Sequence, residues 1–228
     1  MATKTRPKNA TRPSGSKQGR RPQVKPTRGR DIPLLPIAVG GILLALTIGL
    51  IVYVWANTNK PTPGPTPVAG IPCDSLEHTQ VHYHTGLQVM YQGNVVDLPD
   101  NIGIMTNSSG SATCFYWLHV HANDKNVIHI ESPASQTFTL GQFIAVWANW
   151  AKLNGDAVPS LDSTHVTTIA LSPGQALVTY IDLQDGKGPQ LFTGDPNSIV
   201  LKSHEVITLE ITPPQVSTPP ALTFPSGE

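Results

Sequence analysis

The chain has 228 residues, with 15 Lys and Arg against 15 Asp and Glu, and a formal net charge of zero at pH 7. Only 13% of its residues are charged, which excludes a protein that binds nucleic acid through a strongly basic overall composition. The two signs of charge are separated along the chain, because residues 1–31 hold ten Lys or Arg and one acid, whereas five Lys and fourteen Asp or Glu follow from residue 57 onward. The two ends of the chain are therefore expected in different surroundings.

Residues 1–32 form a basic segment rich in Pro, Ser and Thr, without apolar periodicity. A basic arm that binds nucleic acid is one interpretation of such a segment, and a disordered tail is the other. We predict a disordered cytoplasmic tail that fixes membrane topology, and no nucleic-acid partner.

Residues 33–56 are predicted to form a transmembrane anchor in contact with the lipid bilayer. They contain an uncharged run of 23 residues from Leu34 to Ala56, long enough to cross a hydrocarbon core of about 30 Å as a helix. Tyr53 and Trp55 lie at its far end, where aromatic rings favour the membrane interface, and the basic residues before it place the N-terminus in the cytoplasm. A cleaved signal peptide is the alternative, because the end of the run loosely fits a cleavage site. In both cases the rest of the chain is exported.

Two proline-rich segments frame one domain. Residues 57–70 contain four prolines and two glycines, which indicates a stiff, extended spacer. Residues 212–228 are again rich in proline and are predicted to be disordered. The intervening residues 71–211 number about 140, enough for a single hydrophobic core.

The first half of the domain shows the alternation of β-strands. Val81 to Tyr91 alternates, and Gly93-Asn94 predicts a tight turn into a strand from Val95 to Leu98. Cys114 to His121 and Val127 to Glu131 predict a second hairpin, whose histidines share one face across both strands.

One later segment has helical spacing instead. Thr139 and Gln142 fit a capping box, and apolar residues then recur every three or four positions, so residues 140–151 are predicted to form a short amphipathic helix. Four further strands are predicted: Val166–Leu171, Ala176–Asp182, Ser198–Lys202 and Glu205–Ile211. The predicted fold is mainly β, a sandwich or partly open barrel with one short packed helix, preceded by one transmembrane helix.

The chain has two cysteines, Cys73 and Cys114, and both belong to the exported part. An oxidising compartment allows them to pair, and we predict a structural disulfide between them. Closing a loop of this length stabilises a fold by about 4 kcal/mol in the chain-entropy estimate.

Six of the eight histidines lie between His78 and His129. Alternate residues of a strand project from the same face with Cα atoms about 6.5–7 Å apart, so each His-x-His pair presents two donors to one metal ion. Neutral imidazole is a good ligand for zinc, copper, iron and nickel. The predicted metal ligands are His82, His84, His119, His121, His129 and Glu131. His78 and His204 are weaker candidates, and His165 is expected to be exposed in a polar loop.

Several motifs of the domain occur together in a fixed order. They are His82-x-His84, Leu118-His119-x-His121 with Cys114 before it, Ile128-His129-x-Glu131-Ser132 and Thr139-Leu-Gly-Gln-Phe143. In the order of these motifs the chain resembles a group of membrane-anchored or secreted bacterial proteins, and the resemblance covers about residues 71–150. The resemblance implies a shared domain and a bacterial envelope location, and it implies no activity. Members commonly carry Asp soon after the second His-x-His, where this chain has Ala122 and Asn123 before Asp124.

Three functions are compatible with these patterns. The first is a binding module that holds copper or zinc for metal handling or electron transfer. The second is a zinc enzyme in which three histidines activate water, an arrangement that resembles the His-x-His-plus-His set on antiparallel strands of α-type carbonic anhydrases. The third is a surface interaction domain whose histidines are structural. A blue-copper site is disfavoured because Cys114 faces away from His119 on one strand, and a cupin site because Glu131 lies ten residues after His121.

Overall fold

The computed structural model describes residues 34–58, 65–215 and 218–225. The predicted cytoplasmic tail, residues 1–32, lies outside the described residues, as do residues 59–64 of the predicted spacer. The chain divides into two compact units, residues 1–60 and residues 61–228.

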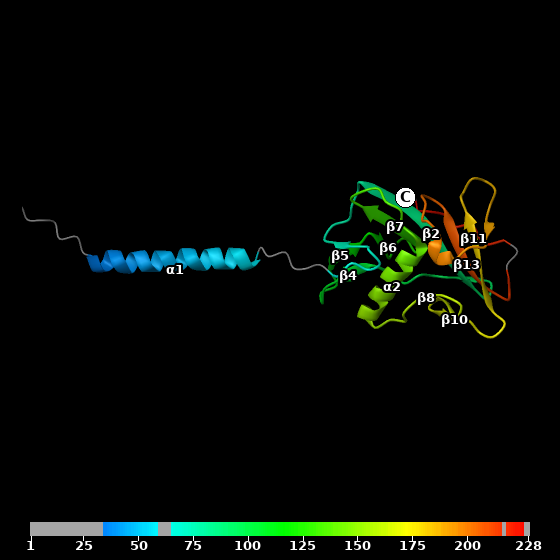
Figure 1. The fold of residues 1–228 in the computed structure, drawn as a ribbon, viewed down its shortest axis with the longest axis horizontal. Coiled ribbons are helices and arrows are strands. Elements are labelled where there is room, and N and C mark those ends of the chain that lie inside the picture. Colours follow the sequence, from blue (N-terminus) through cyan, green and yellow to red (C-terminus); the bar gives the residue numbers. More distant parts are fainter. Residues whose placement is uncertain (1–33, 59–64, 216–217, 226–228) are drawn as a thin grey trace, which may run out of the picture. The chain divides into compact units, whose positions relative to one another are not determined.

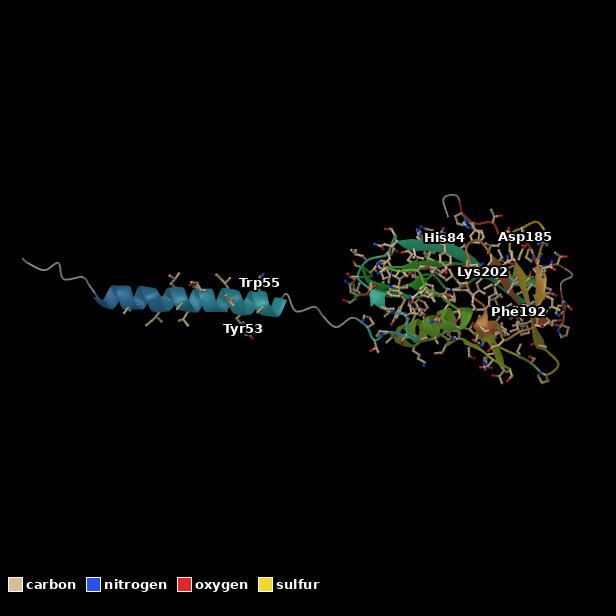
Figure 2. All side chains as sticks on the ribbon, turned by 45° about the horizontal axis from the view of Figure 1, so that its top comes forward. Tyr53, Trp55, His84, Asp185, Phe192 and Lys202 are labelled. Atoms are coloured by element: carbon tan, nitrogen blue, oxygen red, sulfur yellow. A yellow bond between two sulfur atoms is a disulfide. The ribbon has the colours of Figure 1, made fainter. Side chains whose placement is uncertain are left out.

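The first unit contains a single described helix, α1 (Leu34–Thr58), of 25 residues (Figure 1). Within it, Ala38–Ala56 is an uncharged, mainly apolar stretch of 19 residues, none of which is buried. At 1.5 Å per residue this stretch is about 28 Å long, which matches the hydrocarbon core of a bilayer. Tyr53 and Trp55 project from its last turns (Figure 2). By length and composition α1 is a candidate membrane span, and a signal sequence near the N-terminus would have the same properties.

The second unit is built on one large sheet of seven strands. In spatial order the strands are β12 (Gln190–Phe192), β11 (Ala176–Asp182), β13 (Val206–Thr212), β2 (Val81–Tyr91), β7 (Val127–Ser132) and β6 (Leu118–His119), with β3 (Asn94–Val96) also paired to β2. The two central strands β13 and β2 are parallel, and all other neighbours in this sheet are antiparallel.

Two small three-stranded sheets accompany the large one. The first contains β1 (Cys73–Asp74), β5 (Ala112–Tyr116) and β4 (Ile104–Thr106), and the second contains β8 (Ser160–Leu161), β9 (His165–Thr167) and β10 (Ile169–Ala170). The prediction of a mainly β fold with one packed helix is confirmed, and the described strands form open sheets without a closed barrel.

One face of the large sheet belongs to the hydrophobic core. Leu87 of β2 pairs with Ile207 of β13, and Ile130 of β7 pairs with Leu118 of β6; all four side chains are fully buried. The helix α2 (Leu140–Asn154) packs against this core through Phe143 and other apolar side chains (Figure 1). Because side chains alternate along a strand, the residues between these positions point to the opposite face, and that face carries the histidines.

The helix begins where the sequence predicts. Thr139 Oγ1 accepts a hydrogen bond from the Gln142 N–H at 3.3 Å, and Gln142 Oε1 accepts one from the Thr139 N–H at 3.0 Å, which completes the capping box. The helix ends three residues later than the predicted Ala151, because its last residues are exposed and Leu153 does not continue the buried apolar stripe. Gly155 terminates it in the left-handed conformation, with φ 77°.

Two of the predicted strands are wrong. The segment Ser198–Lys202 contains the end of a 3₁₀ turn, η1 (Pro196–Ser198), followed by a single bridge between Val200 and Thr139. The segment Val166–Leu171 is split into β9 and β10, which pair with each other after a reversal at Thr167, where φ is 55°. The two threonines at the reversal are β-branched residues common in strands, so the composition of the segment does not indicate it.

The two predicted hairpins are present with shifted boundaries. The first turn consists of Gln92 and Gly93, both with positive φ (52° and 79°), so Asn94 already belongs to β3 and pairs with Tyr91. β3 ends at Val96 rather than at the predicted Leu98. In the second hairpin the predicted strand from Cys114 to His121 is interrupted at Trp117, which separates β5 from β6.

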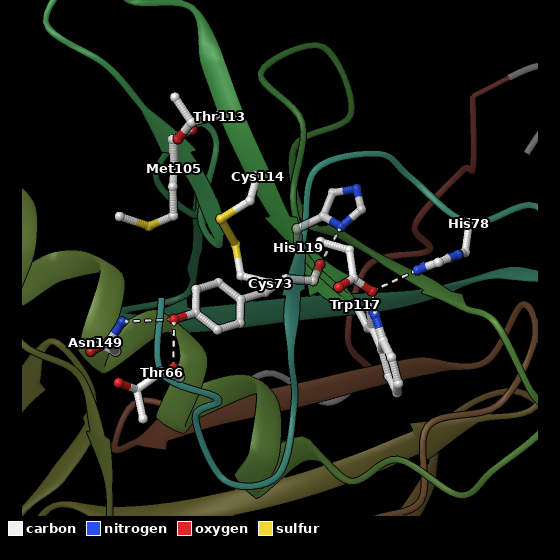
Figure 3. Close-up of a disulfide and its surroundings, with 11 residues drawn as sticks. Thr66, Cys73, His78, Met105, Thr113, Cys114, Trp117, His119 and Asn149 are labelled. Carbon is white, nitrogen blue, oxygen red and sulfur yellow. Dashed lines mark hydrogen bonds and ion pairs between the residues drawn. A yellow bond between two sulfur atoms is a disulfide. The ribbon is translucent and has the colours of Figure 1, made fainter. Parts of the chain in front are cut away.

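The predicted disulfide joins Cys73 of β1 to Cys114 of β5, with the two Cα atoms 5.5 Å apart (Figure 3). It ties the segment that precedes β2 to the strand that leads into β6. Trp117 Nε1 donates to Asp74 Oδ2 at 2.7 Å, and the same oxygen lies 2.7 Å from His78 Nε2. Residues 73–78 are thus held beside the β5–β6 segment by one covalent bond and one hydrogen bond, and the His78–Asp74 contact links the two ends of the segment to each other.

The described part of the C-terminal segment lies on the histidine face of β2. A Cβ atom on Gly86 would lie 3.1 Å from Leu222 Cδ2 and 3.5 Å from Phe224 Cζ. The ring of Phe224 also contacts the ring of His204, with their centroids 5.2 Å apart. Since Gly86 follows His84 by two residues, residues 222–224 border the histidine cluster.

Candidate metal centre

The register of three neighbouring strands places three histidines in one row across the sheet. His119 of β6 is paired with His129 of β7, which is in turn paired with His84 of β2. Directly opposed residues of antiparallel strands share a face and lie close enough for their side chains to touch. The ring centroids of His119 and His129 are 5.4 Å apart, and those of His129 and His84 are 4.5 Å apart.

Four side chains on β2 and β7 form what we call the β2–β7 group: His82, His84, His129 and Glu131. His84 Nε2 lies 3.0 Å from His82 Nε2 and 3.1 Å from His129 Nδ1. Glu131 is paired with His82 across the strands, and its Oε1 lies 3.3 Å from His82 Nε2 and 3.9 Å from His129 Nδ1. Three imidazole nitrogens and one carboxylate oxygen therefore converge on one region.

Three further side chains form what we call the β6 group: His119, His121 and Glu77. The two histidine Nε2 atoms are 3.1 Å apart. Glu77 Oε1 lies 3.7 Å from His119 Nε2 and 3.3 Å from His121 Nε2. Glu77 comes from the segment between β1 and β2 that the disulfide and Asp74 hold beside β6.

A backbone carbonyl sets the tautomer of His119. Its Nδ1 lies 2.8 Å from Tyr116 O, a contact that also appears in Figure 3. A carbonyl oxygen only accepts hydrogen bonds, so Nδ1 must carry the proton and donate. The neutral ring then presents the lone pair of Nε2 toward His121 and Glu77, which is how metal-binding histidines are commonly oriented.

The three histidines of the central row are buried, with 5%, 0% and 4% of the surface of His84, His119 and His129 exposed. Burial is the main cause that lowers the pKa of His84 to about 4, the pKa of His119 to about 3 and the pKa of His129 to about 2. Neighbouring imidazoles lower each pKa further. All three rings are therefore neutral at pH 7, the state in which imidazole binds metal.

The geometry fits a metal ion. Two imidazole nitrogens on one tetrahedral zinc ion are about 3.3 Å apart, given Zn–N bonds of about 2.0–2.1 Å. The neighbouring nitrogens of both groups, at 3.0–3.1 Å, are close to this separation. One ligand atom from each of His82, His84 and His129 lies within 4.8 Å of the others, and the same holds for His119, His121, His129 and Glu131. All six predicted ligands thus lie in one cluster.

The structure adds two acids to the predicted set. Asp124 Oδ2 lies 3.7 Å from His129 Nε2, so the acid that follows the second His-x-His in this chain does reach the cluster despite its shifted position. Glu77 has no pattern around it that predicts this location, because it lies in an irregular segment whose course depends on the distant disulfide.

The remaining histidines lie elsewhere. His78 contacts Asp74 and packs edge-on against Trp117. His204 contacts Phe224, and its backbone N–H donates to His84 O at 2.7 Å, so it borders the cluster. His165 begins β9 and is partly buried, which corrects the expectation of an exposed loop residue.

Comparisons with protein families, with curated proteins and with solved structures found no match for this chain.

Proposed function

We propose that residues 71–211 form an extracytoplasmic metal-binding domain that holds copper or zinc through the histidine cluster, for metal handling or electron transfer. The observation that carries this proposal is the approach of neutral imidazole nitrogens to within 3.0–3.1 Å of one another on three adjacent strands. The same separations fit N–H···N hydrogen bonds between neutral rings, which is the arrangement expected of structural histidines, so metal content is the observation that distinguishes the two.

The donor types favour copper(II) or zinc. The cluster offers imidazoles and carboxylates, and the chain's two cysteines are joined in the disulfide, so no thiolate is available. Imidazole suits zinc and copper, whereas calcium and magnesium prefer all-oxygen sites. The side chains of His82 and His121 are 44% and 30% exposed, which provides a route for exchange with solvent.

The proposed location is a membrane, with α1 as an uncleaved single-pass anchor. The excess of Lys and Arg before α1 supports a cytoplasmic N-terminus and an exported domain. The disulfide supports the same orientation, since structural disulfides persist in oxidising compartments. A bacterial cell envelope is proposed from the motif resemblance alone.

The test is the metal content of the purified full-length chain in detergent, measured by elemental analysis after dialysis. We expect stoichiometric zinc or copper in the parent chain and in His165→Ala, which removes a histidine outside the cluster. We expect reduced content in His84→Ala, whose ring lies between His82 and His129. Parent protein without bound metal would favour an interaction domain with structural histidines.

A metal-dependent enzyme is the second candidate. It is favoured by the set of His82, His84 and His129 on adjacent antiparallel strands, with the carboxylate of Glu131 3.3 Å from His82 Nε2. Such a carboxylate can orient a ligand or act as a general base toward a metal-bound water. Hydrolysis of a test ester or hydration of CO₂ by the zinc-loaded chain would favour the enzyme if the activity is lost in Glu131→Gln. A copper spectrum without turnover would favour metal handling.

A further inference from the structure

Resting on the proposed function, we propose that the cluster is a two-ion centre, in which the β2–β7 group and the β6 group each hold one transition-metal ion. The two groups as defined share no residue and each supplies at least three donors, while His129 of the β2–β7 group also has a ligand atom within 4.8 Å of those of His119 and His121. A structural zinc ion takes four ligands, and a reactive one takes three with an open position. Seven donors therefore exceed what one tetrahedral ion can use.

The β2–β7 group is a complete ligand set. Its three nitrogens and the Glu131 oxygen are linked by separations of 3.0, 3.1, 3.3 and 3.9 Å, and all four side chains project from one face of two paired strands. Three of the four residues are buried, at 5% exposed or less, and only His82 reaches solvent. This is the enclosed ion site of the pair.

The β6 group is a second tripod, in which His119 ends β6, His121 follows two residues later and Glu77 comes from the segment between β1 and β2. His119 Nε2 is directed by the Tyr116 carbonyl toward His121 and Glu77, and the three ligand atoms are separated by 3.1, 3.3 and 3.7 Å. Glu77 is 39% exposed and His121 is 30% exposed, so the remaining coordination positions are open to solvent. This is the ion site from which metal would exchange.

The two groups are neighbours rather than remote sites. One ligand atom from each of His119, His121, His129 and Glu131 lies within 4.8 Å of the others, so the edge of one group meets the edge of the other. Two dications at such a distance repel each other. Three carboxylates, those of Glu77, Asp124 and Glu131, surround the cluster and offset this repulsion.

The experiment counts zinc on the full-length chain in detergent, stripped with a chelator, reloaded with excess zinc sulfate and passed through a desalting column. We expect two equivalents in the parent chain and in His165→Ala. His82→Ala combined with Glu131→Gln leaves the β2–β7 group with two donors, and His121→Ala leaves the β6 group with two. We call these the two single-site variants, and each is expected to retain one equivalent. The variant that carries all three changes is expected to retain none. His82→Asn and His121→Asn serve if an alanine variant loses its native circular dichroism spectrum.

The distance between the two bound ions is tested with copper(II) in place of zinc. Two adjacent copper ions broaden each other's electron paramagnetic resonance spectrum, and each single-site variant should restore the sharper spectrum of an isolated ion. A parent chain that binds neither zinc nor copper would overturn the proposed function itself. One equivalent in the parent, two equivalents in both single-site variants, or two equivalents without magnetic interaction would overturn the two-ion centre and leave metal binding standing.

Discussion

Acidification should destabilise the metal-free domain between pH 7 and pH 5, because the folded state keeps three histidines neutral that the unfolded chain would protonate. The pKa values of His84, His119 and His129 are lowered to about 4, about 3 and about 2, against an unfolded value of 6.5. When a folded-state pKa is lowered for a base, the unfolded state binds more protons below pH 6.5, so stability falls as the pH falls.

The magnitude follows from the interval between pH 6.5 and pH 5. Each pH unit below the unfolded pKa lowers the free energy of unfolding by about 1.4 kcal/mol per group, so one such histidine lowers it by about 2 kcal/mol at pH 5. Three independent groups would lose roughly 6 kcal/mol, which is comparable to the whole stability of a domain of this size. Burial raises the pKa of Glu205, so this one carboxyl group makes the folded state bind more protons on acidification. Its effect on stability is opposite to that of the three histidines.

The assay is urea unfolding of the metal-free unit, residues 61–228, at pH 7 and pH 5, followed by circular dichroism. His165→Ala should show the parent's pH dependence, whereas His129→Asn should show about one third less, because one of the three buried bases is gone. Equal unfolding midpoints at pH 7 and pH 5 in the parent would refute the inference that these rings are buried and neutral. Added zinc should raise the midpoint at pH 5 as well as at pH 7, because the three buried rings stay unprotonated in the folded domain and remain able to bind metal.

Three further substitutions test the elements that position the site. Cys114→Ser opens a loop with a sequence separation of 41 residues and should lower the free energy of unfolding by about 4 kcal/mol, read from denaturant unfolding with and without reductant. Thr139→Ala removes the N-cap of α2 and should cost about 1 kcal/mol in the same assay, with zinc content unchanged. Gly86→Val places methyl groups where Leu222 and Phe224 now lie. The C-terminal segment should therefore become more sensitive to limited proteolysis while the core remains folded. An unchanged cleavage pattern would contradict the packing of residues 222–224 on β2.

The residues that sequence reasoning predicted well are those whose signal is local. His82 and His84, or His119 and His121, share a face by strand alternation alone, and the capping box of α2 is contained within residues 139–142. The register between strands is not local. The row of His119, His129 and His84 depends on two strand pairings, between residues that are 10 and 45 positions apart in the sequence. The parallel contact of β13 with β2 joins residues about 120 positions apart, and no pattern within either strand indicates it.

The sequence does not predict that Glu77 and Asp124 lie beside the histidines, because both residues belong to irregular segments. A ligand on a strand is predicted by its period, but a ligand on an irregular segment is placed by whatever fixes that segment. For Glu77 this is the Cys73–Cys114 disulfide together with the contacts of Asp74, neither of which involves Glu77 itself. Asp124 lies in the turn between β6 and β7, so its reach to His129 depends on the turn's backbone, in which Asn126 adopts a positive φ of 65°.

The two faces of the sheet are coupled through this register. A slip of one residue between β7 and β2 would move Ile128 and Ile130 out of the core and the imidazole of His129 into it. The apolar face therefore specifies the position of the metal ligands on the opposite face, although none of its side chains contacts them through the sheet. It follows that volume-conserving changes such as Ile130→Leu should preserve metal content even where they lower stability, because they retain the pairing that sets the ligand separations. A change that reduced zinc stoichiometry without lowering stability would instead have to act on the histidine face itself, and this difference separates damage to the scaffold from damage to the site.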